Sequence, residues 1–410
     1  MAYDITALRA LFPALSGGTA YFDGPGGTQT PRPVIEAITR ALANPLSNRG
    51  RVTAGERNAD TIVTGAREAM ADLLGARPSG IVFGRSATQL TYDFARTLAA
   101  TWSVGDEVVV TRLDHDANIR PWIQAAERVG ATVRWADFDP ATGELTLDHL
   151  RAALSDRTRL VAVTAASNLI GTRPAVSEMS RLAHEAGALV HVDGVHYTAH
   201  ALVDIGQLGA DFYVCSPYKF LGPHHGVLAA RPELLATLRP DKLLPSSDEV
   251  PERFELGTLP YELLAGTSAA VDVLAGLDTE ATGSRRERLT AGLAALHRHE
   301  ETLRTRIDQG LAGLDGITVH SNAADRTPTV LLTFDESYGA HGTQDASRFL
   351  AERDVHAPSG SFYAIEASRH LGLGDTGGLR IGLAPYTSTE DVDRLLAGLA
   401  LFLKQPRQSC

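Results

Sequence analysis

The chain has 410 residues, a length that favours about two domains over a single core. It is 44% hydrophobic and 21% charged with a net charge of −11, a globular composition that argues against bulk binding to nucleic acid or to an anionic membrane. The sequence contains no apolar stretch of about 18 residues, and its first residues lack the apolar segment of a signal peptide. Its two cysteines, Cys215 and Cys410, form no disulfide framework, so we expect a cytoplasmic protein.

Short apolar runs alternate with helical patterns through the first two thirds of the chain. The expected strands cover residues 81–84, 107–111, 131–135, 160–164, 189–193, 212–215 and 227–230. Helical patterns lie between them, at 88–100, 119–129 and 176–186. This alternation predicts an α/β fold with a mostly parallel seven-stranded sheet that is covered on both faces. Ligands of such sheets bind beyond the carboxyl ends of the strands, where we expect the functional residues.

The pattern changes after a charged stretch at 279–288, which we interpret as a linker or the start of a long helix. The later elements are strands at 317–320, 329–335 and 379–384, a helix at 345–353, and a terminal helix from about Ser388. Ser388 and Asp391 resemble a capping box for that last helix. We therefore expect three units: an N-terminal segment (1–20), a large domain (21–278) and a smaller α+β C-terminal domain (279–410).

Lys219 is one of only three lysines in the chain, and it follows the apolar run 212–215. A desolvated lysine becomes a nucleophilic amine, which forms Schiff bases with aldehydes such as pyridoxal phosphate (PLP). A stem packed under Phe220 is the structural alternative. Asp193 ends another expected strand, and a carboxylate there would keep the pyridine nitrogen of PLP protonated. As a single residue, Asp193 is equally typical of a turn before Gly194.

Polar residues follow three further strands. Ser86, Ala87 and Thr88 begin a helix, where free amides and hydroxyls bind phosphate, although an ordinary N-cap uses the same residues. His115 would lie flat on a planar ring and move protons, and Asn168 would contact ring substituents. Turn formation explains Asn168 equally well as a single residue. A metal site is not expected, because His115 has no Cys or His partner at useful spacing.

Together these motifs resemble the class V aminotransferases, most closely the cysteine desulfurase-like branch of the fold type I PLP enzymes. The resemblance covers nearly the whole chain. It rests on residues 21–29 (YFDGPGGTQ), 115–122 (HDANIRPW), 168–172 (NLIGT), 193–196 (DGVH), 216–219 (SPYK), 254–258 (FELGT) and 379–387 (LRIGLAPYT).

The resemblance implies PLP as cofactor and Lys219, His115 and Asp193 as catalytic residues. The implied cofactor contacts are Ser86, Ala87, Thr88, His115, Asn168, Asp193, His196, Ser216, Tyr218, Lys219 and Thr258. His196 would reach the phenolic oxygen of PLP, and Thr258 would reach the phosphate of the neighbouring subunit in a homodimer. Arg380 would clamp the carboxylate of an amino-acid substrate, a task that suits a planar guanidinium.

The sequence departs from the desulfurases in the stretch 357–364, where that branch carries a mobile nucleophilic cysteine. The stretch contains Ser361, Phe362 and Tyr363 but no cysteine, and we expect Ser361 and Tyr363 to face the substrate. His196 and Tyr218 stand in place of the usual Gln and His. We therefore predict a C–S lyase that acts by β-elimination on cysteine or an S-conjugate, without a persulfide on the enzyme.

Other reactions stay open at this point. The same family supports transamination, epimerisation and decarboxylation of amino acids. A nicotinamide-dependent dehydrogenase is disfavoured, because no Gly-x-Gly-x-x-Gly motif follows the early strands. A non-catalytic PLP-binding protein would have no need to keep Lys219, Asp193, His115 and Arg380 together.

Overall fold

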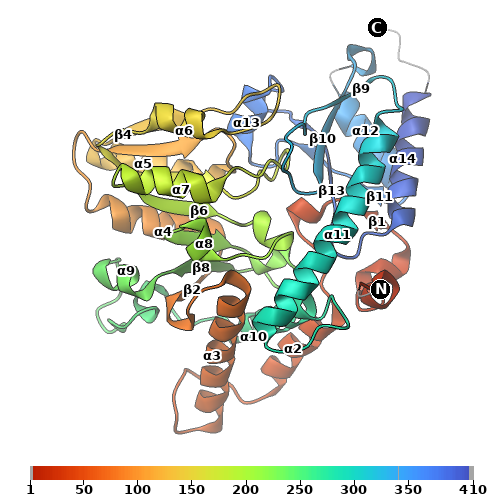
Figure 1. The fold of residues 1–410 in the computed structure, drawn as a ribbon. Helices are drawn as coiled ribbons and strands as arrows, with labels where there is room; N and C mark the ends of the chain where they lie inside the picture. The colour runs from red at the N-terminus through yellow and green to blue at the C-terminus, as the bar shows by residue number, and fades with distance from the viewer. Residues whose placement is uncertain (1–2, 340, 406–410) are drawn as a thin grey trace.

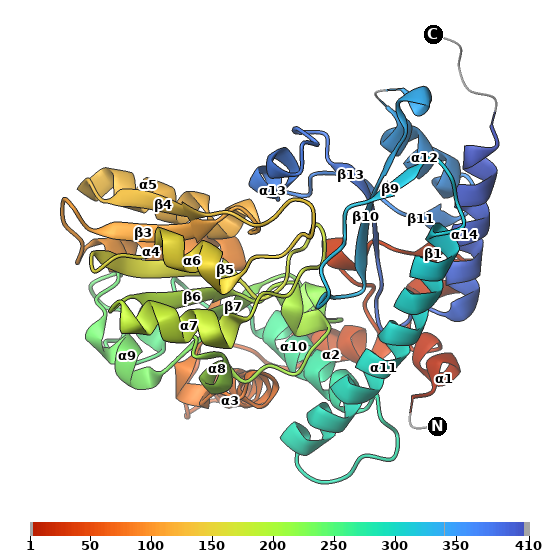
Figure 2. The same ribbon diagram turned by 45° about the horizontal axis from the view of Figure 1, so that its top comes forward.

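The computed structural model describes residues 3–339 and 341–405. Its large part is built on the expected seven-stranded sheet, in the order β2-β8-β7-β6-β5-β3-β4 (Figures 1 and 2). The strands are β2 (Ile81–Gly84), β3 (Glu107–Thr111), β4 (Thr132–Ala136), β5 (Thr158–Thr164), β6 (Leu189–Asp193), β7 (Phe212–Cys215) and β8 (Gly226–Ala230). Only β8 runs antiparallel to its neighbours, so the other six strands end at the same edge.

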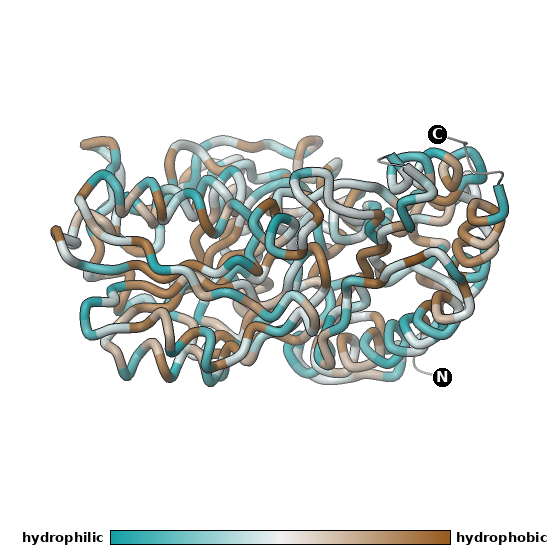
Figure 3. Tube along the Cα trace, turned by 90° about the horizontal axis from the view of Figure 1, so that it is seen from above, coloured by the Kyte–Doolittle hydropathy of each residue, from teal (hydrophilic) through white to brown (hydrophobic). Residues whose placement is uncertain are grey.

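Helices cover both faces of this sheet, as the apolar runs predicted. The helices of the large part are α2 (Arg32–Ala43), α3 (Ala54–Leu74), α4 (Ala87–Ala99), α5 (Arg120–Val129), α6 (Leu147–Ala153), α7 (Val176–Glu185), α8 (Ile205–Leu208), α9 (Pro232–Thr237) and α10 (Tyr261–Ala275). Successive side chains of a strand point to opposite faces. Accordingly Val109 and Val161 pack into one buried cluster, whereas Val108 and Leu160 pack into the other. The strands are therefore continuously apolar, and hydrophobic segments run through the interior in Figure 3.

A smaller part follows the long helix α11 (Arg285–Leu311), so the charged stretch at 279–288 leads into a helix. Its four-stranded antiparallel sheet has the order β12-β13-β10-β9. The elements are β9 (Ile317–Val319), β10 (Thr329–Phe334), α12 (Gly342–Ala351), β12 (Ser359–Gly360), α13 (Ile365–His370), β13 (Gly378–Gly382) and α14 (Thr389–Leu403). The Ser388–Asp391 capping box of α14 is present as predicted.

The N-terminal segment packs against this smaller part. After the short helix α1 (Ile5–Arg9), strand β1 (Ala20–Tyr21) pairs in parallel with β11 (Val355–His356). Ala20 and Phe22 are fully buried in the same cluster as Leu303 and Leu395. The N-terminal segment therefore packs on the C-terminal part, although the large sheet follows it in sequence. The domain boundaries at 21 and 279 stay a prediction.

Among the described residues, no helix has both the length and the apolar character needed to cross a membrane.

Candidate active site

A cavity of about 830 Å³ lies where the carboxyl ends of the large sheet meet β13. Because parallel strands end at one edge, residues that are distant in sequence converge there. Twelve of the residues selected from the sequence line this cavity: Ser86, Ala87, Thr88, His115, Asn168, Asp193, His196, Ser216, Tyr218, Lys219, Tyr363 and Arg380. Ser361 and Thr258 are not among its lining residues.

Lys219 and Asp193 supply the ionisable groups at the centre of the cavity. Lys219 Nζ donates a hydrogen bond to the carbonyl oxygen of Pro25 and lies 4.8 Å from the centre of the Tyr218 ring. Burial and the positive charge of Arg380 lower the pKa of Lys219 to about 7, against a smaller opposite effect of Asp193. Burial raises the pKa of Asp193 to about 6, although its carboxylate accepts a hydrogen bond from the Val195 amide at 2.9 Å. Lys219 therefore provides an uncharged amine near neutral pH.

The N-terminus of α4 forms an anion-binding corner of the cavity. Ser86 caps the helix by accepting the Gln89 amide at 3.0 Å. The amides of Ala87 and Thr88 have no hydrogen-bond partner among the residues that the structure describes, as is usual for the first turn of a helix. Gly226 packs against this turn, where a Cβ would stand 2.3 Å from the Ser86 carbonyl carbon. The corner suits a phosphate group.

His115 is partly buried and neutral. Its Nδ1 accepts the Ala117 amide at 3.0 Å, so the ring proton lies on Nε2. Burial and the charges of Lys219 and Arg380 lower the pKa of His115 to about 4. Its ring lies 5.6 Å from that of Tyr363, at an interplanar angle of 30°. His115 can thus act as an N–H donor at neutral pH.

Beneath His115, Asp114 fixes the turn that presents it. The Asp114 carboxyl accepts from Asn118 Nδ2 at 2.7 Å and contacts the Thr111 hydroxyl. Burial raises the pKa of Asp114 to about 8. The sequence motifs predicted no role for Asp114 in a PLP site. Its spacing of four residues from Asn118 is the sequence feature that indicates their contact. No group of three or more potential metal ligands occurs within the described ranges.

Arg380 is a buried cation that forms no direct ion pair with any described residue. It is only 2% exposed, and no carboxylate in residues 3–339 or 341–405 forms an ion pair with it. Nη1 donates to the Asn168 carbonyl at 2.9 Å, and the guanidinium carbon lies 3.6 Å from the centre of the Phe362 ring. Burial lowers its pKa to about 9, an effect that Asp23 partly offsets. Arg380 Nε and Asn168 Oδ1 are buried with no partner in the described chain, so a donor and an acceptor are left for a ligand there.

The stretch 357–364 is tied to the large part of the molecule. Phe362 and Tyr363 both have positive φ angles, of 52° and 59°, which are unusual for non-glycine residues. Asn168 Nδ2 donates to the Phe362 carbonyl at 2.9 Å, and the Asp116 amide donates to the Tyr363 carbonyl at 2.7 Å. Both carbonyls are thus held, while the Tyr363 side chain is 77% exposed.

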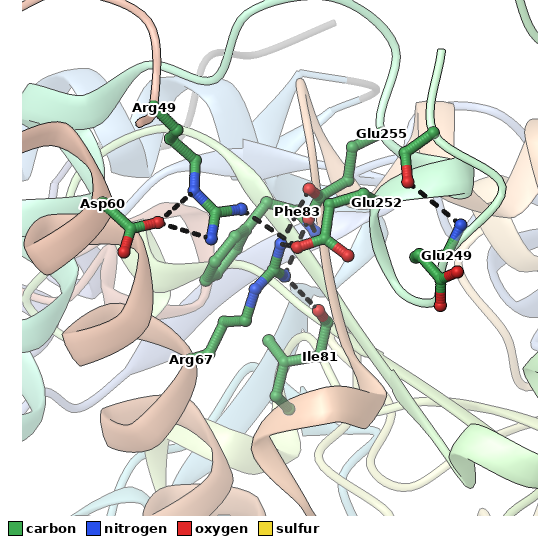
Figure 4. Close-up of polar contacts among 9 residues, drawn as sticks. Arg49, Asp60, Arg67, Ile81, Phe83, Glu249, Glu252 and Glu255 are labelled. Atoms are coloured by element: carbon green, nitrogen blue, oxygen red, sulfur yellow. Dashed lines mark hydrogen bonds and ion pairs between the residues drawn. The ribbon is translucent and has the colours of Figure 1, made fainter. Parts of the chain in front are cut away.

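Thr258 is exposed, and its expected contact with a neighbouring subunit stays a prediction. The segment that carries it is fixed three residues earlier by Glu255 (Figure 4). Glu255 accepts two hydrogen bonds of 2.9 Å from Arg67 and one of 2.9 Å from the Phe83 amide. Arg67 also donates to the Ile81 carbonyl. This ion pair joins α3, β2 and the Thr258 segment.

Cys215 is the one free cysteine among the described residues, and its side chain is fully buried on β7. Burial raises the pKa of its thiol. Cys410 lies outside the described residues. The amine of Lys219, the carboxylate of Asp193, the N-terminus of α4 and the imidazole of His115 lie in one cavity, and their chemistry fits the pyridoxal phosphate that the sequence predicted.

Comparison with known proteins gives consistent results. The Aminotransferase class-V family model matches residues 20–395. The uncharacterized protein MT3887 of Mycobacterium tuberculosis is 33% identical over 405 residues, which are 98% of this chain and 99% of that protein. The aminotransferase-like protein FGM3 of Gibberella zeae is 31% identical over 421 residues, with 98% and 99% covered. The structure of apo cysteine desulfurase from Thermococcus onnurineus NA1 has a TM-score of 0.88 at 26% identity, with 99% of each chain covered.

Proposed function

Since the chain belongs to the class V aminotransferase family of PLP-dependent enzymes with fold type I, we propose that it is a C–S lyase. Its substrate would be cysteine or an S-conjugated cysteine. The reaction converts the amino acid and water into a thiol, pyruvate and ammonia, with cleavage of the Cβ–S bond and loss of the α-proton. PLP supplies the electron sink that makes the α-proton acidic.

The residues of the cavity divide this reaction among them. Arg380 would bind the α-carboxylate, since its guanidinium is buried without a counter-ion. Lys219 would remove the α-proton, because its lowered pKa leaves much of the amine uncharged at neutral pH. His115 would donate its Nε2 proton to the departing thiolate, since Nδ1 is already an acceptor. Asp193 would stabilise a protonated pyridine nitrogen.

The observation that carries the proposal is the nature of the stretch 357–364. It contains no thiol, and its backbone is held by Asn168 and Asp116. A desulfurase needs a nucleophile that attacks the substrate sulfur. Cys215 is unsuitable, because it is fully buried and its thiol pKa is raised. Elimination of a thiol needs no such nucleophile.

Transamination is the second candidate, and the similarity to the aminotransferase-like protein of Gibberella zeae favours it. It would use the same amine, carboxylate and clamp, and Lys219 would move the α-proton to the C4′ position instead of leaving it to accompany loss of a thiol. Epimerisation would require a proton donor on the opposite face of Cα, and decarboxylation would require the α-carboxylate bond to lie perpendicular to the ring.

Product analysis separates these reactions. Holoenzyme should release pyruvate with an equal amount of hydrogen sulfide from cysteine, or with an equal amount of the aryl thiol from S-aryl cysteines. The matched control is the double variant Cys215→Ser/Cys410→Ser, which should release both products at the wild-type rate. Accumulation of the α-keto acid of the intact substrate would show that the enzyme is an aminotransferase and not a lyase. Formation of alanine together with a persulfide on either cysteine would restore the desulfurase mechanism.

We also propose that the enzyme is a cytoplasmic homodimer. The family resemblance supports the dimer, with Thr258 near the phosphate of the neighbouring subunit, and the low cysteine content supports a reducing compartment. Sedimentation velocity should give a particle of about twice the 43.7 kDa chain mass. A monomeric holoenzyme with full activity would exclude the shared site.

A further inference from the structure

His196 makes a contact that the sequence comparison did not suggest. It follows β6, lines the cavity and is only 4% exposed. Its Nε2 lies 2.9 Å from Thr327 Oγ1 and 3.0 Å from Thr329 Oγ1. Its Nδ1 makes no hydrogen bond to any described residue. One ring nitrogen is therefore held by the protein, and the other is left for a ligand.

The two threonines belong to the smaller part of the molecule. Thr329 begins β10, whose pairing with β13 places Leu331 opposite Arg380. The Thr327 amide donates to the Gly171 carbonyl at 2.9 Å, which ties this strand to the large part. The threonine pair therefore connects His196 to the strands that carry the carboxylate clamp.

The charged groups around His196 favour its neutral form. Burial, His200, Arg380 and Lys219 hold the pKa of His196 well below its usual range. His200 lies with its ring centroid 4.9 Å away and binds the buried Glu300 at 2.9 Å. A neutral imidazole carries one N–H, and the partner of one nitrogen decides which nitrogen bears it.

We propose that Thr327 and Thr329 are positioning residues that hold His196 in the Nδ1–H tautomer. Thr327 Oγ1 also lies 3.3 Å from the Gly171 carbonyl, whereas the Thr329 hydroxyl has no acceptor other than Nε2 among the described residues. The Thr329 hydroxyl would therefore donate to Nε2, which places the ring proton on Nδ1, the nitrogen with no partner in the described chain. An N–H donor of this kind suits the phenolic oxygen of PLP. The inference requires PLP in the cavity, and it is independent of the choice between lyase and aminotransferase.

The first test needs no substitution in the threonines. Nitrogen-15 NMR of the imidazoles in the full-length protein reports the tautomer directly, and His196→Gln identifies the His196 signals. We expect a protonated Nδ1 and an unprotonated Nε2. A protonated Nε2 in the wild-type protein would overturn the proposal, whatever the variants do.

The second test measures PLP affinity. Thr327→Val/Thr329→Val keeps the shape of both side chains but removes the hydroxyls, and it should weaken PLP binding about tenfold. Thr327→Ser/Thr329→Ser should restore the wild-type Kd. Thr333→Val is the matched control, because Thr333 lies on the same strand and its hydroxyl binds His320 at 2.8 Å, away from the cavity residues.

The variants also separate positioning from simple stability. If the double valine variant binds PLP as tightly as Thr333→Val, the threonines do not position His196. An equal loss of affinity in the serine and valine variants would likewise reject the role of the hydroxyls. Because neither test monitors products, failure of the lyase proposal would leave these results interpretable.

Discussion

Two buried arginines show how this molecule separates stability from function. Arg67 is 6% exposed and Arg380 is 2% exposed. Glu255 accepts two hydrogen bonds of 2.9 Å from Arg67, whereas no carboxylate in the described chain forms an ion pair with Arg380. Removal of a guanidinium from water costs free energy. For Arg67 the hydrogen bonds to Glu255 offset that desolvation cost. For Arg380 the charge of Asp23 offsets that cost only in part and without an ion pair, which favours a ligand that provides the anion.

The other neighbours of Arg67 and Arg380 show the same difference in how far their donors are used. Arg67 also donates to the Ile81 carbonyl, so its hydrogen-bonding capacity is used by backbone and carboxylate. Arg380 keeps an unpartnered Nε among the described residues and has the Phe362 ring against its face. An aromatic face attracts a cation without neutralising it. The guanidinium of Arg380 is therefore held in place while its charge remains available to a ligand.

The largest expected effect is on stability. Arg67→Met leaves Glu255 as an unpaired buried charge, which should lower the free energy of unfolding by about 3–5 kcal/mol. Chemical denaturation would measure this loss. Arg77→Met is the control, because the Arg77–Glu233 pair is exposed and should contribute little to stability. Equal losses in the two variants would contradict the structural role of Arg67.

Arg380→Met should show the opposite behaviour. Its kcat/KM should fall about 100-fold, a loss of about 2.7 kcal/mol, because the substrate carboxylate loses its partner. Its free energy of unfolding should not fall, since the substitution removes an unpaired buried charge. Arg380→Lys keeps the charge but loses the planar donor pair, so we expect an intermediate kcat/KM. If Arg380→Met lowers the free energy of unfolding and leaves kcat/KM unchanged, Arg380 has a structural role like that of Arg67 and does not bind the substrate.

The pH dependence of PLP loading tests the electrostatic difference. The neutral amine is the reactive form of Lys219, so loading of cofactor-free protein should rise about tenfold per pH unit below about 7 and level off above it. Arg380→Met should move the midpoint upward, because the charge of Arg380 helps to lower the pKa of Lys219. Arg67→Met should leave the midpoint unchanged. Loading rates that do not vary between pH 5.5 and 8.5 would reject the lowered pKa.

The smallest expected effect concerns Phe362. Phe362→Leu removes the aromatic face from Arg380 and should weaken substrate binding by about 1 kcal/mol, seen as a roughly fivefold rise in KM. Phe349→Leu is the matched control. The centre of the Phe349 ring lies 3.5 Å from the guanidinium carbon of Arg353, and neither residue lines the cavity. A similar change of KM in both variants would show that the contact of Phe362 with Arg380 does not contribute to substrate binding.

Local patterns predicted the strands of the large sheet well. The strands Ile81–Gly84, Glu107–Thr111, Leu189–Asp193 and Phe212–Cys215 have the predicted limits, because their apolar runs end at polar or glycine-containing turns. The two-residue strands Ala20–Tyr21, Val355–His356 and Ser359–Gly360 were missed. A strand of two residues has no periodicity to detect, and tertiary pairing alone defines it.

The side chains of the site were predictable for a related reason. Lys219, Asp193 and His115 follow strands whose ends meet at one edge, so sequence position alone brings them together. The pairs Arg67–Glu255 and His196–Thr329 are separated by 188 and 133 residues, and no local spacing indicates them. The sequence therefore identified chemical groups, whereas the structure was needed to find which of them lack partners.

The most direct test of the account is the position of the Schiff base. Borohydride reduction of the PLP-loaded protein, followed by peptide mass mapping, should place the label on Lys219 and leave Lys242 and Lys404, the other two lysines, unmodified. Lys219→Ala should lose both the label and the visible absorbance. A labelled Lys242 or Lys404, or a Lys219→Ala variant with an intact chromophore, would contradict the account.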